Sequence, residues 1–143
     1  KMNLIMETVS SEGSSTYTFK VANIEQGTTT TIFTKTSPHG TFMQISPNAW
    51  SPDNKYFFIK EIGFTSTNYF VFKTTGEAIS SGEQFIDVMP FFVAKNTGYS
   101  LSDITGWDSE TLLHVYASKA DGARGPSFWF EVPSKAIIQL ASR

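Results

Sequence analysis

Two histidines, 13 carboxylates and no cysteine are the side chains from which this chain could build a metal site or an acid–base site. His39 lies in a turn, Ser37-Pro38-His39-Gly40, and His114 lies inside an apolar strand segment. Two distant histidines without cysteine do not make a zinc site unless carboxylates complete it. We therefore interpret His39 as solvated and His114 as a buried or half-buried residue of the core. The sequence predicts neither a metal ion nor a cofactor.

Serine is common in this chain, but no serine stands in a sequence context that would activate its hydroxyl as a nucleophile. The HExxH pair of zinc proteases, the GxSxG nucleophile turn, the phosphate-binding loop and the EF-hand pattern are all absent from the sequence. The sequence thus predicts no catalytic residue and favours a binding protein over an enzyme.

The composition predicts one all-β domain. With 143 residues, the chain has the size of an ordinary single domain. Hydrophobic residues make up 40% of it and aromatic residues 15%, and aromatic side chains favour half-buried, pleated surfaces. The formal net charge of −2 argues against a nucleic-acid surface, which needs clustered lysine and arginine. No apolar run reaches the roughly 18 residues of a membrane span, so we expect none in this chain.

The elements that must position any functional residue are organised around residues 50–59. Residues 52–54, Pro-Asp-Asn, are typical of a tight turn. The apolar run that follows them predicts a strand that is covered on both faces. A second strand is predicted at residues 69–73, and it ends at another turn, residues 74–77.

Three copies of this pattern follow each other along the chain, at about 1–35, 36–83 and 84–143. Each copy has a first strand, a second strand with the pattern aromatic-x-aromatic-charge, a turn and a third strand. The first strands are predicted at 1–7, 55–61 and 111–116, the second at 17–20, 70–73 and 128–131, and the third at 28–33, 77–80 and 135–140. Further strands at 40–45 and 85–88 would complete four-stranded antiparallel sheets. We predict no helix, and we interpret residues 134–142 as a strand.

The motifs WSPDNK at 50–55, YFVF at 69–72 and TGE at 75–77 resemble the repeat of TolB-type β-propellers, which are relatives of the WD-type repeat. Asn54 replaces the glycine of the family pattern, and it also tolerates left-handed φ. The resemblance implies four-stranded propeller blades. The alternative fold is a β-sandwich.

A propeller closes with about four to eight blades, and three copies alone are too few. Further blades could lie outside this chain, a homodimer could complete a six-bladed ring, or the sheets could form an open stack. Trp50 opens the second copy and Trp107 the third, whereas the first copy starts one residue too late for a tryptophan. We therefore expect this chain to be part of a longer one.

Two residue types recur at the start of a repeat, and each has two interpretations. Trp50 and Trp107 either wedge between adjacent sheets or form a platform that binds a sugar or a peptide. Asp53 and Asp108 either form turns, which we favour, or bind a metal or substrate around a channel.

Three further residues are considered for binding. Asp103 precedes the second tryptophan turn, and Asp87 lies in a strand candidate that would face the mouth of a propeller channel. Arg124 lies between glycines in the loop at residues 120–126, either as a contact residue or as a solvated tip. The predicted binding residues are therefore Trp50, Trp107, Asp103 and Arg124.

The resemblance implies a non-enzymatic binding or scaffold module that presents a surface to a protein or peptide partner. It also implies a bacterial, extracytoplasmic setting, in the periplasm or at the cell surface. Two alternatives remain open, namely the non-catalytic propeller domain of a prolyl-oligopeptidase-like hydrolase and a glycan-binding propeller. Sequence beyond the two ends of this chain would separate the first alternative from a binding module.

Overall fold

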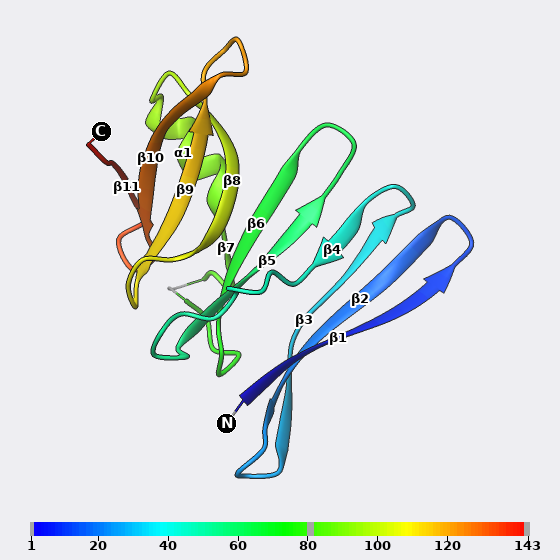
Figure 1. The fold of residues 1–143 in the computed structure, drawn as a ribbon. Coiled ribbons are helices and arrows are strands. Elements are labelled where there is room, and N and C mark those ends of the chain that lie inside the picture. The colour runs from blue at the N-terminus through cyan, green and yellow to red at the C-terminus, as the bar shows by residue number, and fades with distance from the viewer. Residues whose placement is uncertain (1, 80–81, 142–143) are drawn as a thin grey trace.

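The computed structural model describes residues 2–79 and 82–141, which form three antiparallel sheets and one short helix (Figure 1). The first sheet consists of β1 (Met2–Ser11), β2 (Ser14–Asn23) and β3 (Thr28–Pro38). The second sheet consists of β4 (Phe42–Gln44), β5 (Tyr56–Ile62), β6 (Thr67–Lys73) and β7 (Ile86–Asp87). The third sheet consists of β8 (Ser100–Trp107), β9 (Leu112–Ser118), β10 (Arg124–Glu131) and β11 (Ala136–Gln139). Helix α1 (Val88–Lys95) connects the second sheet to the third.

Each sheet is a meander in which every strand pairs antiparallel with the next strand along the chain. The prediction of an all-β fold made of antiparallel sheets is therefore confirmed. The described part of the first sheet has three strands instead of the predicted four. Propeller-like blades and a sandwich are both consistent with sheets of this size.

The prediction that the chain has no helix is wrong, because α1 follows β7 directly. Asp87 caps the N-terminus of α1 by accepting a hydrogen bond from the backbone N–H of Met89 at 3.3 Å, and Asn96 ends the helix with a left-handed φ of 56°. Only Val88 and Phe92 of the helix are buried. The sequence of α1 is apolar nearly throughout, so the 3.6-residue period that would mark a helix is hidden.

The prediction of a third strand at residues 77–80 is also wrong. Residues 77–79 have no strand structure, and Ser80 lies outside the described residues, as do Lys1 and Ser142 of two other predicted strands. The partner of β6 is instead β7, which lies in the segment where a further strand was expected. The loop between them is closed by a hydrogen bond from Ile79 N–H to the Glu83 carbonyl at 2.9 Å.

The tryptophan turn forms as predicted and is held by side-chain hydrogen bonds. The Ser51 hydroxyl donates to Asp53 at 2.8 Å, and the same Asp53 oxygen accepts the backbone N–H of Lys55 at 3.2 Å. Asn54 adopts a φ of 61°, which is the left-handed conformation that this residue tolerates. Asp53 therefore acts as a turn residue that launches β5.

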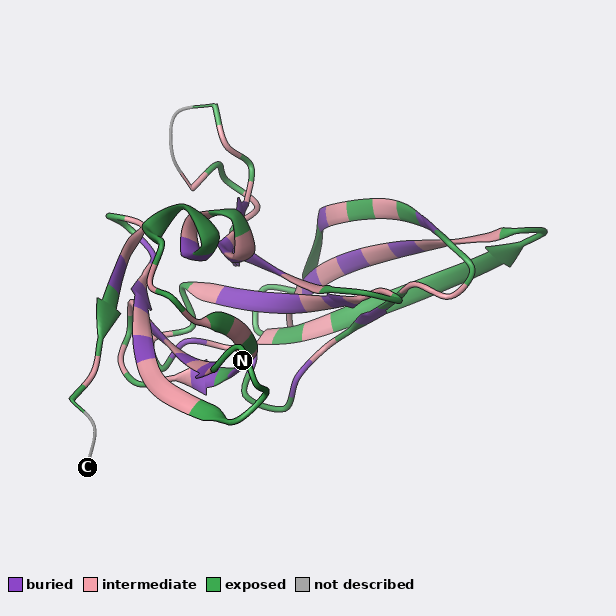
Figure 2. Cartoon of the chain, turned by 90° about the horizontal axis from the view of Figure 1, so that it is seen from above, coloured by how far each residue is buried: buried purple, intermediate pink, exposed green. Residues whose placement is uncertain are grey.

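The second sheet lies between the other two and is covered on both faces (Figures 1 and 2). Phe57 of β5 and Phe72 of β6 face the first sheet, and their rings stack with centroids 5.3 Å apart. Phe58 and Val71 are a cross-strand pair on the opposite face and belong to the cluster shared with the third sheet. All four side chains are fully buried. This double burial explains the continuous apolar run that the sequence shows here.

Helix α1 closes one side of the cluster between the second and third sheets. Phe92 of α1 packs edge-on against Phe128 of β10, with ring centroids 5.1 Å apart. Tyr99 contacts the same Phe128 ring at 6.1 Å. Phe91 of α1 lies against Phe130 of β10 at 6.1 Å, so two aromatic pairs fix the helix to the third sheet.

We predict that Phe128→Ala lowers the free energy of unfolding by about 3–5 kcal/mol, because it removes a ring that is 1% exposed and leaves a cavity under α1. Urea denaturation measures this value. Phe64→Ala is the matched control, since the Phe64 ring is 86% exposed and its removal should change stability by at most about 0.5 kcal/mol. Similar losses in both variants would contradict the packing described here.

Candidate functional site

Both predicted tryptophans lie where neighbouring elements meet. Trp50 is half-buried and packs against Phe57, with ring centroids 5.9 Å apart. Trp107 stacks on Tyr56 of the second sheet at 6.0 Å and donates its indole N–H to the Ala49 carbonyl at 2.9 Å. The second of these contacts ties the end of β8 to the turn before β5. Both tryptophans also line one cavity, of about 560 Å³.

Asp103 lies on β8 and connects the third sheet to the second. One of its carboxylate oxygens accepts hydrogen bonds from Lys60 Nζ at 2.8 Å, from the Tyr69 hydroxyl at 3.1 Å and from the backbone N–H of Ile104 at 2.9 Å. Burial raises the pKa of Tyr69, and the negative charge of Asp103 raises it further. Tyr69 therefore remains a neutral hydrogen-bond donor. One carboxylate oxygen of Asp103 connects the third sheet to the second by accepting from Lys60 and Tyr69.

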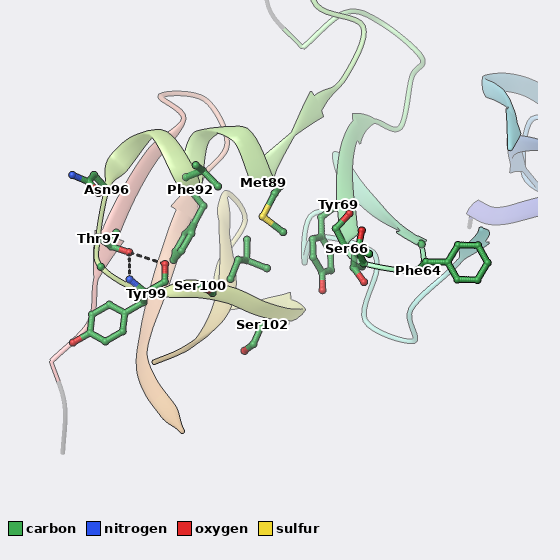
Figure 3. Close-up of a pocket in the computed structure, with 16 residues that line it drawn as sticks. Phe64, Ser66, Tyr69, Met89, Phe92, Asn96, Thr97, Tyr99, Ser100 and Ser102 are labelled. Carbon is green, nitrogen blue, oxygen red and sulfur yellow. Dashed lines mark hydrogen bonds between the residues drawn. The ribbon is translucent and has the colours of Figure 1, made fainter. Parts of the chain in front are cut away.

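A cavity of about 640 Å³ opens beside this cluster, between the loop that joins β5 to β6, helix α1 and the start of β8 (Figure 3). Most residues that line it are aromatic, apolar or hydroxyl-bearing, among them Phe64, Tyr69, Met89, Phe92, Tyr99 and Ser102, and Asn96 adds an amide. None of its described lining residues carries an ionised side chain at neutral pH. This cavity can offer hydrogen bonds and ring contacts to a neutral group, and it offers no acid–base pair.

Glu61 forms a second polar cluster, which joins the second sheet to the first. Its side chain is 8% exposed and contacts Lys35 Nζ at 2.5 Å, Asn68 Nδ2 at 3.1 Å and the Ser37 hydroxyl at 3.4 Å. Burial by itself would raise the pKa of Glu61, but the hydrogen bonds and the charge of Lys35 outweigh it and hold the pKa below its usual value. Glu61 is therefore a buried anion that links the sheets.

A third cluster lies on the face of the third sheet that points away from the core. Leu113 and Val115 of β9 face the core, so the residue between them, His114, faces outward. His114 Nδ1 lies 2.5 Å from a carboxylate oxygen of Asp108, and His114 Nε2 lies 3.2 Å from the hydroxyl of Ser127 on β10. The expectation that His114 is a core residue is thus wrong, because its side chain points away from the core. The expectation that it is half-buried is confirmed.

Trp129 completes this cluster by donating its indole N–H to the same Asp108 oxygen at 2.8 Å. The β9–β10 register creates the arrangement, because it pairs Trp129 directly with His114 and Ser127 directly with Tyr116. Sequence reasoning missed the cluster. The alternation of β9 and β10 indicates which residues share a face, but the register between two strands depends on the loop that joins them.

Arg124 lies at the start of β10, close to this cluster. It is exposed, and its guanidinium carbon is 5.7 Å from the centroid of the Tyr116 ring. Arg124, His114 and Ser127 line one cavity of about 530 Å³. The structure thus places Trp50 and Trp107 in one cavity, which His114 also lines, and places Arg124 in another, with His114 and Ser127. Asp103 lines neither of these two cavities.

In comparisons with known proteins, the chain matches no family, no curated protein and no solved structure. Within residues 2–79 and 82–141, no group of three or more His, Asp or Glu side chains is placed to hold a metal ion. The helix of the described chain is too short to cross a membrane.

We predict that Glu61→Gln lowers the free energy of unfolding at neutral pH by about 1–3 kcal/mol, because Lys35 loses its charged partner. The folded-state pKa of Glu61 is lowered, so its contribution is present above the usual carboxyl pKa and is lost as the pH falls through the folded-state value. The difference between wild type and variant should therefore shrink from about pH 7 to about pH 3.

Urea denaturation at a series of pH values measures that difference. Glu110→Gln, which changes an exposed carboxylate in the turn between β8 and β9, is the control and should change stability by at most about 0.5 kcal/mol at any pH. A Glu61 difference that stays constant or grows toward low pH would contradict the assigned role.

Proposed function

We propose that this chain is a protein-binding module that adds an extended strand from another polypeptide to the open edge of β1. The supporting observation is that β1 is a ten-residue strand whose only partner among the described residues is β2. Its backbone groups on the other side are available for a partner strand, which is the usual basis of β-strand addition. The exposed residues along β1 are visible in Figure 2.

The β1 edge lacks the features that protect the other sheet edges of the described chain. The β1–β2 register runs without a bulge from Met2 to Ser11, and residues 2–11 contain neither lysine nor proline. In contrast, β4 and β7 are very short, β8 has two irregularities, and β3 ends at Pro38. Glu7 is the charged residue of β1, and it forms an ion pair with Lys20 of β2 at 2.9 Å. Long, regular edges without lysine or proline are those that pair with other chains.

The internal repeat indicates where a partner strand would lie. The aligned first strands of the three copies correspond to β1, β5 and β9. β5 pairs with β6 along one edge and with β4 along the other. In the same way, β9 pairs with β10 along one edge and with β8 along the other. The corresponding edge of β1 has no neighbour among the described residues, so this fold already uses the same edge twice for strand pairing.

The sequence of β1 favours a second copy of this chain as the partner. Antiparallel pairing about Ile5 places Ile5 opposite its own copy and Leu4 opposite Met6, so apolar side chains meet on both faces. The same register places Asn3 opposite Glu7, where the amide can donate to the carboxylate. Ile5 and Met6 are 38% and 37% exposed in the single chain, and this pairing would cover both.

The hairpin geometry supports this register as well. The two-residue turn between β1 and β2 closes on the pair Ser11–Ser14, and antiparallel pairs then alternate between bonded and non-bonded. This alternation directs the N–H and C=O groups of Leu4, Met6 and Thr8 toward the open edge. Those groups face each other when two copies pair about Ile5.

The resemblance to TolB-type repeats supports the same proposal from the sequence. The faces and loops of such propellers are the surfaces that bind a protein or peptide, whereas their strand edges are short and protected, so the resemblance supports a protein-binding role and the long open edge of β1 is specific to this chain. The extracytoplasmic setting implied by the resemblance is part of this proposal. A prolyl-oligopeptidase-like or glycan-binding role has no specific support in the geometry described above.

We predict that the protein is a dimer of twice 15.9 kDa and that Ile5→Lys makes it monomeric, because two like charges would meet at the centre of the interface. Light scattering after size exclusion measures the mass. Ile24→Lys is the matched control, since Ile24 is 57% exposed and lies outside β1, and it should remain a dimer.

Hydrogen exchange localises the interface in the same samples. The amides of Met6 and Thr8 should become more protected as the protein concentration rises, whereas the exposed amides of the Gly122 turn should not change. A wild-type protein that stays monomeric at high concentration, or a dimer that Ile5→Lys leaves intact, would overturn pairing through β1.

A further inference from the structure

Asp108, His114 and Ser127 contact each other in the order carboxylate, imidazole, hydroxyl. The same order activates the serine of serine hydrolases. The carboxylate of Asp108 accepts from His114 Nδ1, which places the ring proton on Nδ1 when the imidazole is neutral. His114 Nε2 is then a lone-pair acceptor, and the Ser127 hydroxyl at 3.2 Å is its donor. The hydroxyl therefore points its proton at a base while its oxygen lone pairs stay free.

We propose that Ser127 is the nucleophile of an acyl-transfer site on the outer face of the third sheet, with His114 as its general base and a small carboxylate-bearing ester as its substrate. This proposal goes beyond the binding function proposed above and does not depend on it. It also differs from the expectation that no serine of this chain is activated. That expectation rested on sequence context, whereas here the activating residue comes from a neighbouring strand.

The surroundings of Ser127 leave room for such a substrate. Ser127 and His114 line the cavity of about 530 Å³, and neither residue is fully buried. The backbone of Ser127 is fixed on its other side, because its carbonyl accepts the Leu140 N–H at 2.9 Å. Arg124 is the cation that lines the same cavity, and a guanidinium pairs well with a carboxylate. This is why we assign an acidic group to the substrate.

The reaction follows from these positions. The Ser127 oxygen attacks the ester carbonyl carbon while its proton moves to His114 Nε2. The bond to the leaving alcohol then breaks, the alcohol takes the proton from His114, and the acyl group remains as an ester on Ser127. Water attacks that ester, gives a proton to His114, and the Ser127 oxygen recovers this proton as the carboxylic acid leaves.

Asp108 and Trp129 are positioning residues in this proposal. The Asp108 oxygen that contacts His114 also accepts the Trp129 indole N–H at 2.8 Å, so the carboxylate is held by two donors. Holding Asp108 fixes the tautomer and orientation of the imidazole, which is the role of the acidic residue in serine hydrolases. Tyr116 packs on the His114 ring with centroids 4.6 Å apart and further limits its rotation.

A fluorophosphonate probe tests the nucleophile directly, because it forms a covalent bond only with an activated serine. Mass spectrometry should find one probe per chain, located at Ser127. Ser127→Ala should abolish the label, and His114→Asn should slow labelling by at least about 100-fold, the usual effect of removing a general base. Ser102→Ala, an exposed serine on β8 of the same sheet, is the matched control and should label like wild type.

Two further variants test the positioning and the substrate. Asp108→Asn presents an amide donor to Nδ1, so the imidazole ¹⁵N shifts should report the reversed tautomer and labelling should fall with it. For hydrolysis, wild type should prefer the mono-p-nitrophenyl ester of succinate over p-nitrophenyl acetate. Arg124→Ala should lose this preference, whereas Lys119→Ala, in the neighbouring loop, should keep it.

Thermal unfolding of every variant shows that each loss occurs in a folded protein. Labelling that maps to another serine, labelling that is equal with and without His114, or no labelling of folded wild type would each overturn the proposal. The last result would leave the cluster as a hydrogen-bond network that only holds β8, β9 and β10 together. A Ser127 label without a preference for succinate would confirm the nucleophile and overturn the assigned role of Arg124.

Discussion

The burial of the second sheet on both faces is the constraint on which the rest of this structure depends. β5 and β6 alternate their side chains between two separate clusters, so each of the outer sheets has an apolar surface to pack against. Rings such as Phe57, Phe58 and Phe72 are fully buried within these clusters. Polar contacts between sheets are accordingly few and specific, with Glu61 joining the first sheet and Asp103 joining the third.

This packing determines where chemistry can take place. A side chain that faces the second sheet is needed for stability, and the two cluster carboxylates Glu61 and Asp103 are bound by lysine and other donors. Side chains on the outer face of the third sheet do not pack against another sheet, since no described sheet covers that face. His114, Ser127 and Trp129 therefore keep polar groups there that contact only one another and Asp108. Polar side chains that are held by such contacts on a rigid sheet are suited to function.

The sequence predicted the features that local chemistry decides. The tryptophan turn, the double-sided strand β5 and the aromatic strands β6 and β10 follow from turn residues and from alternation, and all are present. Helix α1 was missed because its residues are apolar on all sides, and the strand at 77–80 was misplaced because loop closure decides which residues pair with β6. The Asp108–His114–Ser127 contact was missed for a related reason. It depends on the register of β9 against β10, which no single strand encodes.

The open edge and the serine cluster lie on different sheets, and this separation makes them independent. The edge of β1 belongs to the first sheet, whose packed face contacts the second sheet through one cluster. Ser127 belongs to the third sheet, which contacts the second through the other cluster and through α1. The β1 edge and the Ser127 cluster share no residue, and the second sheet, which is buried on both faces, lies between the two sheets that carry them. Pairing of two copies through β1 would therefore leave the cavity beside Ser127 open, so a dimer can carry two separate sites.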